Sequence, residues 1–246
     1  AKPRSPDMSE NLRVGFTLTP ISNFALTFDA YQIDVADRIA VTTTFSPIDT
    51  RLSADGVTTI GQQLQAIMVA NGLSPDVSGQ YYTNAIDTRT RGFDIVATYK
   101  YGTVDFGDFD FSFGYNQNET EITGIIDNPP ELAALGDIVI FDRSKQAALT
   151  ESLPKSKISL NSGWALDRLS ANLRLTRFGE YTTRHSSNPA LDNDIDAAWI
   201  TDLQVNYDVT DAVRVTLGAN NIFNVYPTKI QEPSANLGNG MYSGLA

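Results

Sequence analysis

The chain has 246 residues, 41% of them hydrophobic, with a formal net charge of −11 at pH 7 and no cysteine. That acidity argues against a nucleic-acid partner, because a phosphate backbone is bound by basic surfaces, and the lack of cysteine excludes disulfide scaffolds and thiolate metal sites. No apolar run approaches the roughly 18 residues of a membrane-spanning helix, so only strands could carry this chain across a bilayer.

Eight segments with strictly alternating apolar and polar residues follow one another along the chain. Side chains alternate between the two faces of a strand, so each segment is expected to be a strand with one apolar face. The apolar face contains no charged residue, as Val14, Phe16 and Leu18 illustrate for the first segment. In chain order the segments are residues 12–18, 24–30, 93–101, 109–115, 158–166, 169–175, 199–207 and 213–219.

The opposite face of these segments carries all of their charges. The charged residues are Arg13, Asp29, Asp94, Lys100, Asp110, Arg174, Asp202 and Arg214. A face without charge must meet an apolar environment, whereas the charged face meets water. In a membrane barrel these eight side chains would face the lumen, where charges of both signs would pair with one another.

Short and long connections alternate between the segments. The first link, residues 19–23, is short, whereas about 62 residues separate the second segment from the third. Short links recur at 102–108, 167–168 and 208–212, and long ones at 116–157, 176–198 and from residue 220 onward. Transmembrane barrels show this asymmetry, with short turns on one side of the membrane and long loops on the other.

The long connections contain strand extensions and a helix. Residues 31–45, 82–92 and 119–123 are expected to extend strands on the long-loop side. Residues 56–71 are expected to be helical, because Ile60, Leu64, Ile67 and Met68 are spaced for one face and Gly72 is a plausible stop. This helix either folds over a barrel mouth or packs on its neighbours. Pro129 and Pro130 predict a stiff surface loop.

Aromatic residues gather near both ends of the segments. Tyr99, Tyr101, Trp164 and Tyr207 lie near short links, and Tyr115, Phe178, Tyr181 and Trp199 lie near long ones. This distribution is typical of the two aromatic belts of a membrane barrel. A charge at mid-membrane on a lipid-facing surface costs about 2–4 kcal/mol, which accounts for the charge-free face. A soluble antiparallel sandwich or jelly roll, with that face as its core, is the alternative.

Candidate catalytic and metal-binding groups are few. His185 is the one histidine and lies beside serines in a polar loop, without a held base or an oxyanion pocket. The acidic run 192–196 lacks the glycine and closing Glu of a known calcium loop. Asp108 and Asp110 could run glycosidic chemistry but are better explained as lumen wall. The sequence therefore predicts no enzyme activity, no cofactor and no metal site.

Three stretches resemble one family. The opening, from Lys2 to Phe16 with its Lys-Pro pair, the stretch Phe24 to Ile39, and Thr90-Arg91-Gly92 before Phe93 are similar to barrel segments of TonB-dependent outer-membrane receptors. Residues 197–226 resemble that family's penultimate hairpin. The signature that ends it comprises Gly218, Asn220, Asn221, Ile222, Phe223 and Asn224.

The resemblance implies an all-β, antiparallel transmembrane β-barrel portion with long extracellular loops. Residues 1–246 would form about eight strands of a plugged barrel of about 22 strands, with the plug domain and the closing strand outside this chain. The eight charges would then face a hydrated, releasable plug. The implied place is the outer membrane of a Gram-negative bacterium, with lipid, plug, the TonB complex and a small-molecule cargo as partners.

Three functions remain open from the sequence. The first is active uptake of a scarce nutrient, such as a ferric siderophore, cobalamin or an oligosaccharide, with energy delivered through TonB. A passive outer-membrane channel would make the inward charges selectivity elements. A soluble secreted β-domain that binds carbohydrate would need no detergent. The Lys-Pro opening and the Asn-Ile-Phe-Asn signature favour the first.

Overall fold

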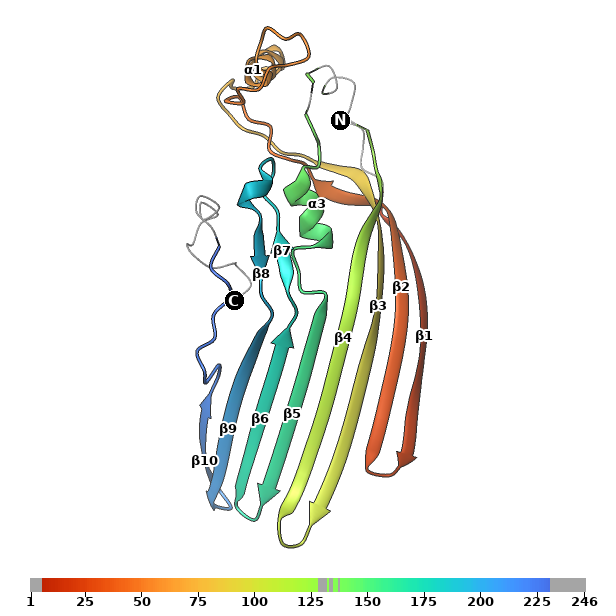
Figure 1. Ribbon diagram of the computed structural model, residues 1–246, viewed down its shortest axis with the longest axis vertical. Helices are drawn as coiled ribbons and strands as arrows, with labels where there is room; N and C mark the ends of the chain where they lie inside the picture. Colours follow the sequence, from red (N-terminus) through yellow and green to blue (C-terminus); the bar gives the residue numbers. More distant parts are fainter. Residues whose placement is uncertain (1–5, 128–131, 133–134, 137, 231–246) are drawn as a thin grey trace.

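The computed structural model describes residues 6–127, 132, 135–136 and 138–230. Eight antiparallel strands form one curved sheet, in the order β1-β2-β3-β4-β5-β6-β9-β10 (Figure 1). They are β1 (Met8–Ile21), β2 (Phe24–Val41), β3 (Tyr82–Thr103), β4 (Gly107–Ile125), β5 (Ser156–Leu166), β6 (Leu169–Phe178), β9 (Ala198–Thr210) and β10 (Val213–Ala219). Each alternating segment lies in one of these strands, so the eight expected strands are confirmed.

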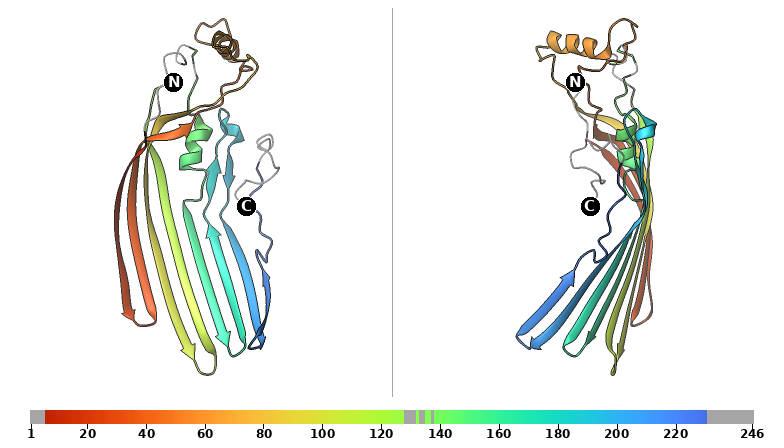
Figure 2. Two further views of the ribbon diagram at one scale, coloured as in Figure 1. Left: turned by 180° about the vertical axis from the view of Figure 1, so that it is seen from behind. Right: turned by 60° about the vertical axis from the view of Figure 1, so that its left-hand side comes forward.

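All short connections lie at one end of the sheet and all long ones at the other (Figures 1 and 2). Ser22 and Asn23 join β1 to β2, and Asp167 and Arg168 join β5 to β6. Asp167 adopts a left-handed backbone conformation with φ +49°, which Asp tolerates better than most residues. Consecutive strands therefore pair with their neighbours in sequence, as the alternation of connections predicts.

The strand extensions are largely as expected. β3 begins at Tyr82 and β4 continues to Ile125, whereas β2 ends at Val41, short of the expected residue 45. Asp37, with φ +55°, marks a register shift in β2. Beyond Val41 the extended pairing is reduced to an isolated bridge between Phe45 and Gly79.

The expected helix is shorter than residues 56–71. It is α1 (Ile60–Ala70), and it begins late because Thr59 and Gln62 form a capping box that satisfies the first free N–H groups. Ile60 and Leu64 are buried as predicted, but Ile67 is 40% exposed, so the expected apolar face is only partly covered.

The remaining elements lie in the long loops. They are α3 (Arg143–Thr150), the two-stranded sheet of β7 (Tyr181–Thr183) with β8 (Asn193–Ile195), and the 3-10 turn η1 (Pro189–Leu191). The sequence pattern predicted none of them, because each is too short to show a period. The Lys2-Pro3 opening and the Pro129-Pro130 pair lie outside the described residues.

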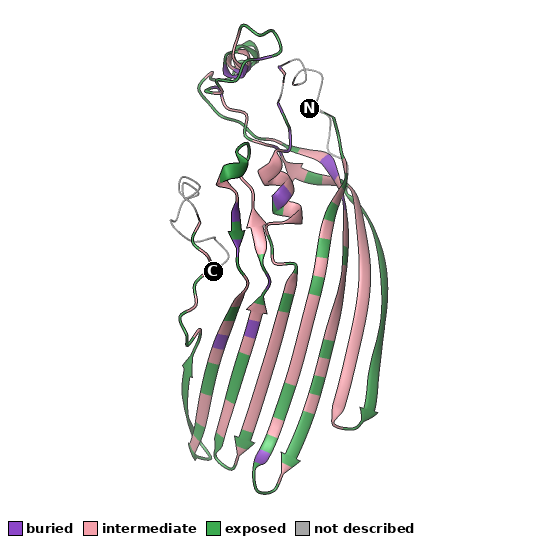
Figure 3. Ribbon diagram, in the orientation of Figure 1, coloured by how far each residue is buried: buried purple, intermediate pink, exposed green. Residues whose placement is uncertain are grey.

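Buried apolar residues are found at the long-loop end and not under the sheet (Figure 3). Ile60 packs with Leu64, Leu135 and Ile138 in one cluster. The other cluster consists of Ala85, Ile86, Ile140 and Phe141. Each of them is a small loop core that orders the region above the strands.

The apolar face of the sheet has no protein layer over it among the described residues. Leu12 is 67% exposed and Leu217 is 74% exposed, at opposite edges of the sheet. A soluble sandwich would bury these side chains, so the arrangement contradicts that alternative and fits a surface that meets hydrocarbon. None of the helices in the described part of the chain has the length and apolarity to cross a membrane.

Aromatic rings cross the apolar face between β1 and β4. Phe16 stacks on Phe28 with ring centroids 5.5 Å apart, Phe28 stacks on Phe93, and Phe93 meets Tyr115 edge-on. Near the short turns Tyr99 stacks on Tyr101. Of these rings, Tyr115 was expected in the belt near the long loops, and Tyr99 and Tyr101 in the belt near the short turns.

Phe178 does not belong to the belt assigned to it. In β6 it lies an even number of residues from Arg174, so it lies on the polar face, where the Lys157 ammonium stands 5.2 Å from its ring centroid. Trp199, paired with Arg177 in the adjacent strand, keeps the belt position on the apolar face. The alternation of the segment 169–175 continues through Phe178 and would have placed it correctly.

A matched pair of arginine substitutions tests the two faces. Leu26→Arg places a charge within the apolar face, whereas Thr27→Arg places it on the polar face of the same strand. We expect Leu26→Arg to destabilise the membrane-inserted protein by about 2–4 kcal/mol and Thr27→Arg to have little effect. The measurement is the folded fraction of the complete protein in phospholipid vesicles against denaturant. Equal effects would contradict the assignment of faces.

Candidate functional site

The polar face of the sheet carries the eight charged residues singled out from the sequence. In its first half Arg13 forms an ion pair with Asp29, at 2.9 Å. Asp29 lies opposite Asp94 in the next strand, and Asp94 accepts a hydrogen bond of 2.7 Å from the Asn116 amide. Lys100 and Asp110 face each other at 3.6 Å.

The second half of the polar face is bonded differently from the expectation. Arg174 lies opposite Asp202 in register, but its Nε donates to the Asn161 amide oxygen, at 3.2 Å. Arg214 forms a two-pronged pair with Asp208, with distances of 2.5 and 2.8 Å. Asp208 was outside the alternating segments and therefore escaped the sequence argument.

These pairs form a wall of fixed charges and amides across the sheet. Arg13 remains 71% exposed and Lys100 77% exposed, so the charges stay in contact with solvent. Surface pairs of this kind contribute roughly 0–1 kcal/mol each to stability. Their chemical consequence is a polar, hydrated surface of mixed sign, on the face opposite the apolar one.

The family-signature residues form a tight turn at the end of β10. Asn221 and Asn224 both have left-handed backbone conformations, with φ +49° and +53°. The Asn221 side chain bridges to Val225, accepting from its N–H and donating to its carbonyl, both at 2.9 Å. Asparagine suits these positions because its short polar side chain tolerates positive φ and bonds locally.

This turn is fixed to the neighbouring strand. The Asn221 N–H donates to the Asp202 carboxylate at 2.8 Å, and the Ile222 N–H donates to the Thr201 carbonyl at 2.9 Å. Asp202, expected to be only a wall charge, therefore also holds the signature turn. Gly218 lies within β10, Asn220 follows it, and Phe223 is 71% exposed.

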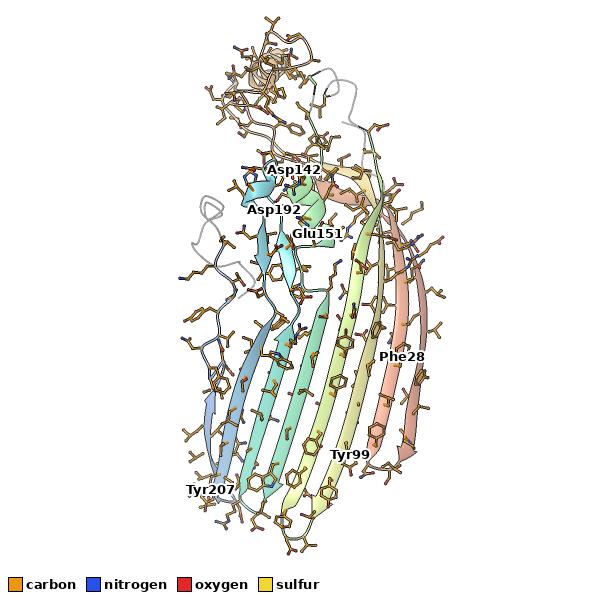
Figure 4. The ribbon with its side chains drawn as sticks, in the orientation of Figure 1. Phe28, Tyr99, Asp142, Glu151, Asp192 and Tyr207 are labelled. Atoms are coloured by element: carbon orange, nitrogen blue, oxygen red, sulfur yellow. The ribbon has the colours of Figure 1, made fainter. Side chains whose placement is uncertain are left out.

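A network of charged residues orders the loops at the long-loop end of the sheet. Arg143, the first residue of α3, pairs with Asp192 at 2.7 Å. Arg184 contacts both Asp192, at 3.0 Å, and Glu151, at 2.5 Å. Figure 4 shows Asp192 and Glu151 gathered near α3, well above Phe28, Tyr99 and Tyr207 on the strands.

The network lowers the pKa of its central carboxyl, that of Asp192. The Arg143 guanidinium, followed by the His185 backbone N–H and Arg184, holds the pKa of Asp192 well below its usual range. The Asp192 side chain is only 13% exposed. Arg143 and Asp192 are 49 residues apart in sequence, so no local pattern could have predicted this pair.

Two hollows open beside this network. The first, of about 760 Å³, is polar and lined by residues that include Glu119, Glu180 and Arg184. The second, of about 540 Å³, is mostly apolar and includes Phe178, Tyr181 and Tyr226. Hollows of this volume are in the range that holds small molecules. They lie around the long-loop ends of β5, β6 and β9.

The catalytic and metal candidates have structural roles in the fold. The His185 Nδ1 accepts from the backbone N–H groups of Ser187 and Asn188, at 3.2 and 3.1 Å, which fixes a turn. Asp110 is paired with Lys100. In the described ranges of the chain, no group of three or more His, Cys, Asp or Glu residues is placed to hold a metal ion.

A comparison with known families shows the family to which this sheet belongs. The model of the TonB-dependent receptor-like β-barrel matches residues 5–222. The chain belongs to the TonB-dependent receptor family. Proteins of this family are β-barrel receptors and transporters in the outer membrane of Gram-negative bacteria, and the family is not one of enzymes. The predicted family and fold class are thus confirmed.

Solved receptors share the fold at low sequence identity. The FrpB iron transporter from Neisseria meningitidis (F3-3 variant) aligns with a TM-score of 0.60 at 14% identity, covering 92% of this chain and 28% of that one. The ferric-catecholate import receptor Fiu from Escherichia coli K12 aligns with a TM-score of 0.54 at 14% identity, covering 90% and 24%.

The ferripyoverdine receptor of Pseudomonas aeruginosa, bound to ferripyoverdine, gives a TM-score of 0.54 at 14% identity, covering 92% of this chain and 24% of that one. At these identities the similarity is one of fold. The chain spans about a quarter of the length of these receptors. No curated protein sequence matches the chain.

Substitutions of Asn221 test whether the signature turn depends on the left-handed conformation of this residue. Asn221→Ala should destabilise the receptor by about 2–4 kcal/mol, because alanine at positive φ costs roughly 1–2 kcal/mol and side-chain bonds to Val225 are lost. Asn221→Gly keeps the backbone freedom and should recover the conformational part of this loss. The measurement is the unfolding midpoint in detergent. Equal unfolding midpoints for the two variants would show that Asn221 does not contribute through its tolerance of the left-handed conformation.

The loop network predicts a dependence on pH. Because the folded pKa of Asp192 is lowered, its stabilisation is complete above the ordinary carboxyl pKa and is lost as the pH falls through the folded pKa. A spin label at Ser186→Cys should therefore be immobile at pH 7 and become mobile only in strong acid. Asp192→Asn should be mobile at both pH values.

The matched control is Asp194→Asn. Its carboxylate accepts a hydrogen bond of 2.8 Å from the Thr182 hydroxyl and lies in the same hairpin. Label mobility in this variant should follow the unmodified receptor. Mobility equal to that of Asp192→Asn would show that either carboxylate of this hairpin orders the loop, against the specific pairing of Asp192 with Arg143.

Proposed function

We propose that this chain is part of an active outer-membrane transporter that takes up a scarce nutrient with energy delivered through TonB. The observation that carries the proposal is the polar face of the sheet, where charges of both signs are paired and still exposed. Such a wall can hold a plug domain through hydrated contacts and release it, because surface pairs of this strength exchange readily with water.

In this proposal Arg13, Asp29, Asp94, Lys100, Asp110, Arg174, Asp202 and Arg214 face the lumen and contact a plug domain of the same parent protein. The loops above, ordered by the Arg143, Asp192 and Arg184 network, act as the receptor for cargo. The two hollows below the loops are the places where a small molecule would first be held. The TonB complex is the remaining partner.

A ferric siderophore is the cargo we favour, with cobalamin and an oligosaccharide as the other candidates. Support comes from the similar solved structures, which include an iron transporter and a ferric-catecholate import receptor. The hollow that combines Phe178 with Tyr181 and Tyr226 suits a flat or aromatic chelate, because aromatic rings pack against one another in offset-stacked or edge-to-face arrangements.

Transport assays with the complete receptor test this function. Cells that depend on it should accumulate radiolabelled iron from a ferric siderophore, and a protonophore should abolish the accumulation. Labelled cobalamin and a labelled maltooligosaccharide serve as parallel cargoes. Uptake that persists without energy and merely equalises concentrations would instead identify a passive channel, in which the inward charges are selectivity elements.

A further inference from the structure

Two cations on the polar face of the sheet have no carboxylate partner. Lys157 in β5 and Arg174 in β6 are both exposed, and neither forms an ion pair with a residue that the structure describes. Other cations of this face are each paired with a carboxylate: Arg13 with Asp29, Lys100 with Asp110 and Arg214 with Asp208. The wall of β5 and β6 therefore carries positive charge that its neighbours leave unneutralised.

The guanidinium of Arg174 keeps free hydrogen-bond donors. Its Nε donates to the Asn161 amide oxygen at 3.2 Å, and its terminal nitrogens form no hydrogen bond with a described residue. Asp202 lies opposite Arg174 in register, but its carboxylate accepts the Asn221 N–H of the signature turn, at 2.8 Å. Because a guanidinium presents its N–H groups as a fork that fits an anion, Arg174 is a ready anion contact in the lumen.

Lys157 lies over an aromatic ring and not beside a carboxylate. Its ammonium is 5.2 Å from the ring centroid of Phe178, its cross-strand partner. The same ring lines the mostly apolar hollow of about 540 Å³. A molecule held against Phe178 in that hollow would therefore meet an unpaired cation.

A line of polar side chains leads from the hollow to Arg174. Ile200 of the hollow pairs in register with Thr176, and Thr176 pairs with Ser159 in β5. Arg174 follows two residues further along β6, on the same face. The rows that contain Lys157 and Arg174 are four residues apart, or roughly 13 Å along the strands. The wall thus presents a cation, two hydroxyls and a second cation in succession.

The wall of β2 and β3 has the opposite character. Asp29 lies directly opposite Asp94 in register, so two carboxylates are neighbours there. Arg13 pairs with Asp29, whereas Asp94 accepts a hydrogen bond from the neutral Asn116 amide. An anion in the lumen is therefore attracted to β5 and β6 more than to β2 and β3.

We propose that cargo leaves the hollow along the wall of β5 and β6, and that this cargo is negatively charged. The inference rests on the proposed uptake function and adds to it the charge of the cargo and the side of the barrel on which it passes. An anion binds first beside Lys157, on the ring of Phe178, and then at Arg174. Two weak sites in succession favour passage, because each is strong enough to attract the ion and weak enough to release it.

Charged thiol reagents measure the electrostatic potential along this wall in the complete receptor, made free of other cysteines. Ser159→Cys lies between the two cations, and the matched control Thr27→Cys lies in the same cross-strand row of β2, two residues from Asp29. The probes are an anionic and a cationic methanethiosulfonate, added to energised cells. We expect the ratio of anionic to cationic reaction rates to be about fivefold higher at Ser159→Cys than at Thr27→Cys.

Arg174→Gln should lower that ratio about fivefold at Ser159→Cys and leave it unchanged at Thr27→Cys, because a single charge acts over about one screening length. Lys157→Gln provides the same test if Arg174→Gln fails to fold. Equal ratios at the two cysteines, or a ratio that neither substitution changes, would overturn the proposal. So would the absence of any reaction at Ser159→Cys, since no aqueous path would then reach this wall.

Uptake by the same cells separates this inference from the proposed function. The cargoes are iron on an anionic tris-catecholate siderophore, iron on an uncharged tris-hydroxamate siderophore, and an uncharged labelled maltooligosaccharide. We expect energy-dependent uptake of the anionic cargo, slowed several-fold by Arg174→Gln. Energy-dependent uptake of uncharged cargo alone would overturn the inference and leave the transport function standing. No energy-dependent uptake of any cargo would overturn both.

Discussion

The structure depends on the separation of charge between the two faces of one sheet. In hydrocarbon every backbone polar group must be bonded within the sheet, and a charge on the lipid side costs several kcal/mol. The alternating segments of the strands meet both demands, since their backbones pair in antiparallel register and the charges within these segments all lie on the polar face. Because lipid covers the apolar face, the protein needs no second layer, and its buried clusters are free to order the loops.

The separation of charge between the two faces also explains why the two ends of the strands differ. At the short turns little more than chain reversal is needed, and an aspartate at positive φ is sufficient. At the long-loop end the strands leave the membrane, and their outer face changes within two residues from Phe93 to Arg91. Above that boundary polar networks replace the lipid as the organising environment, as the bonds of Asp192 with Arg143 and Arg184 show.

The signature of the family receives a physical explanation from the turn that it forms. Two asparagines in left-handed conformations end β10, and Asp202 accepts the Asn221 N–H from the adjacent strand. Asp202 therefore connects the polar wall to the end of the strand. The motif that identifies the family in the sequence therefore has a structural role. It ends the strand pairing at a defined height and turns the chain.

The sequence by itself determined the strands, their two faces and the alternation of short turns with long loops, because these follow from local rules of period two and turn chemistry. It also placed Arg13 with Asp29 on a common face. The tertiary structure alone decided the partners of Arg174 and Arg214. It also decided the pairing of Arg143 with Asp192 across 49 residues, since such contacts depend on how loops fold over strands and leave no periodic trace in the chain.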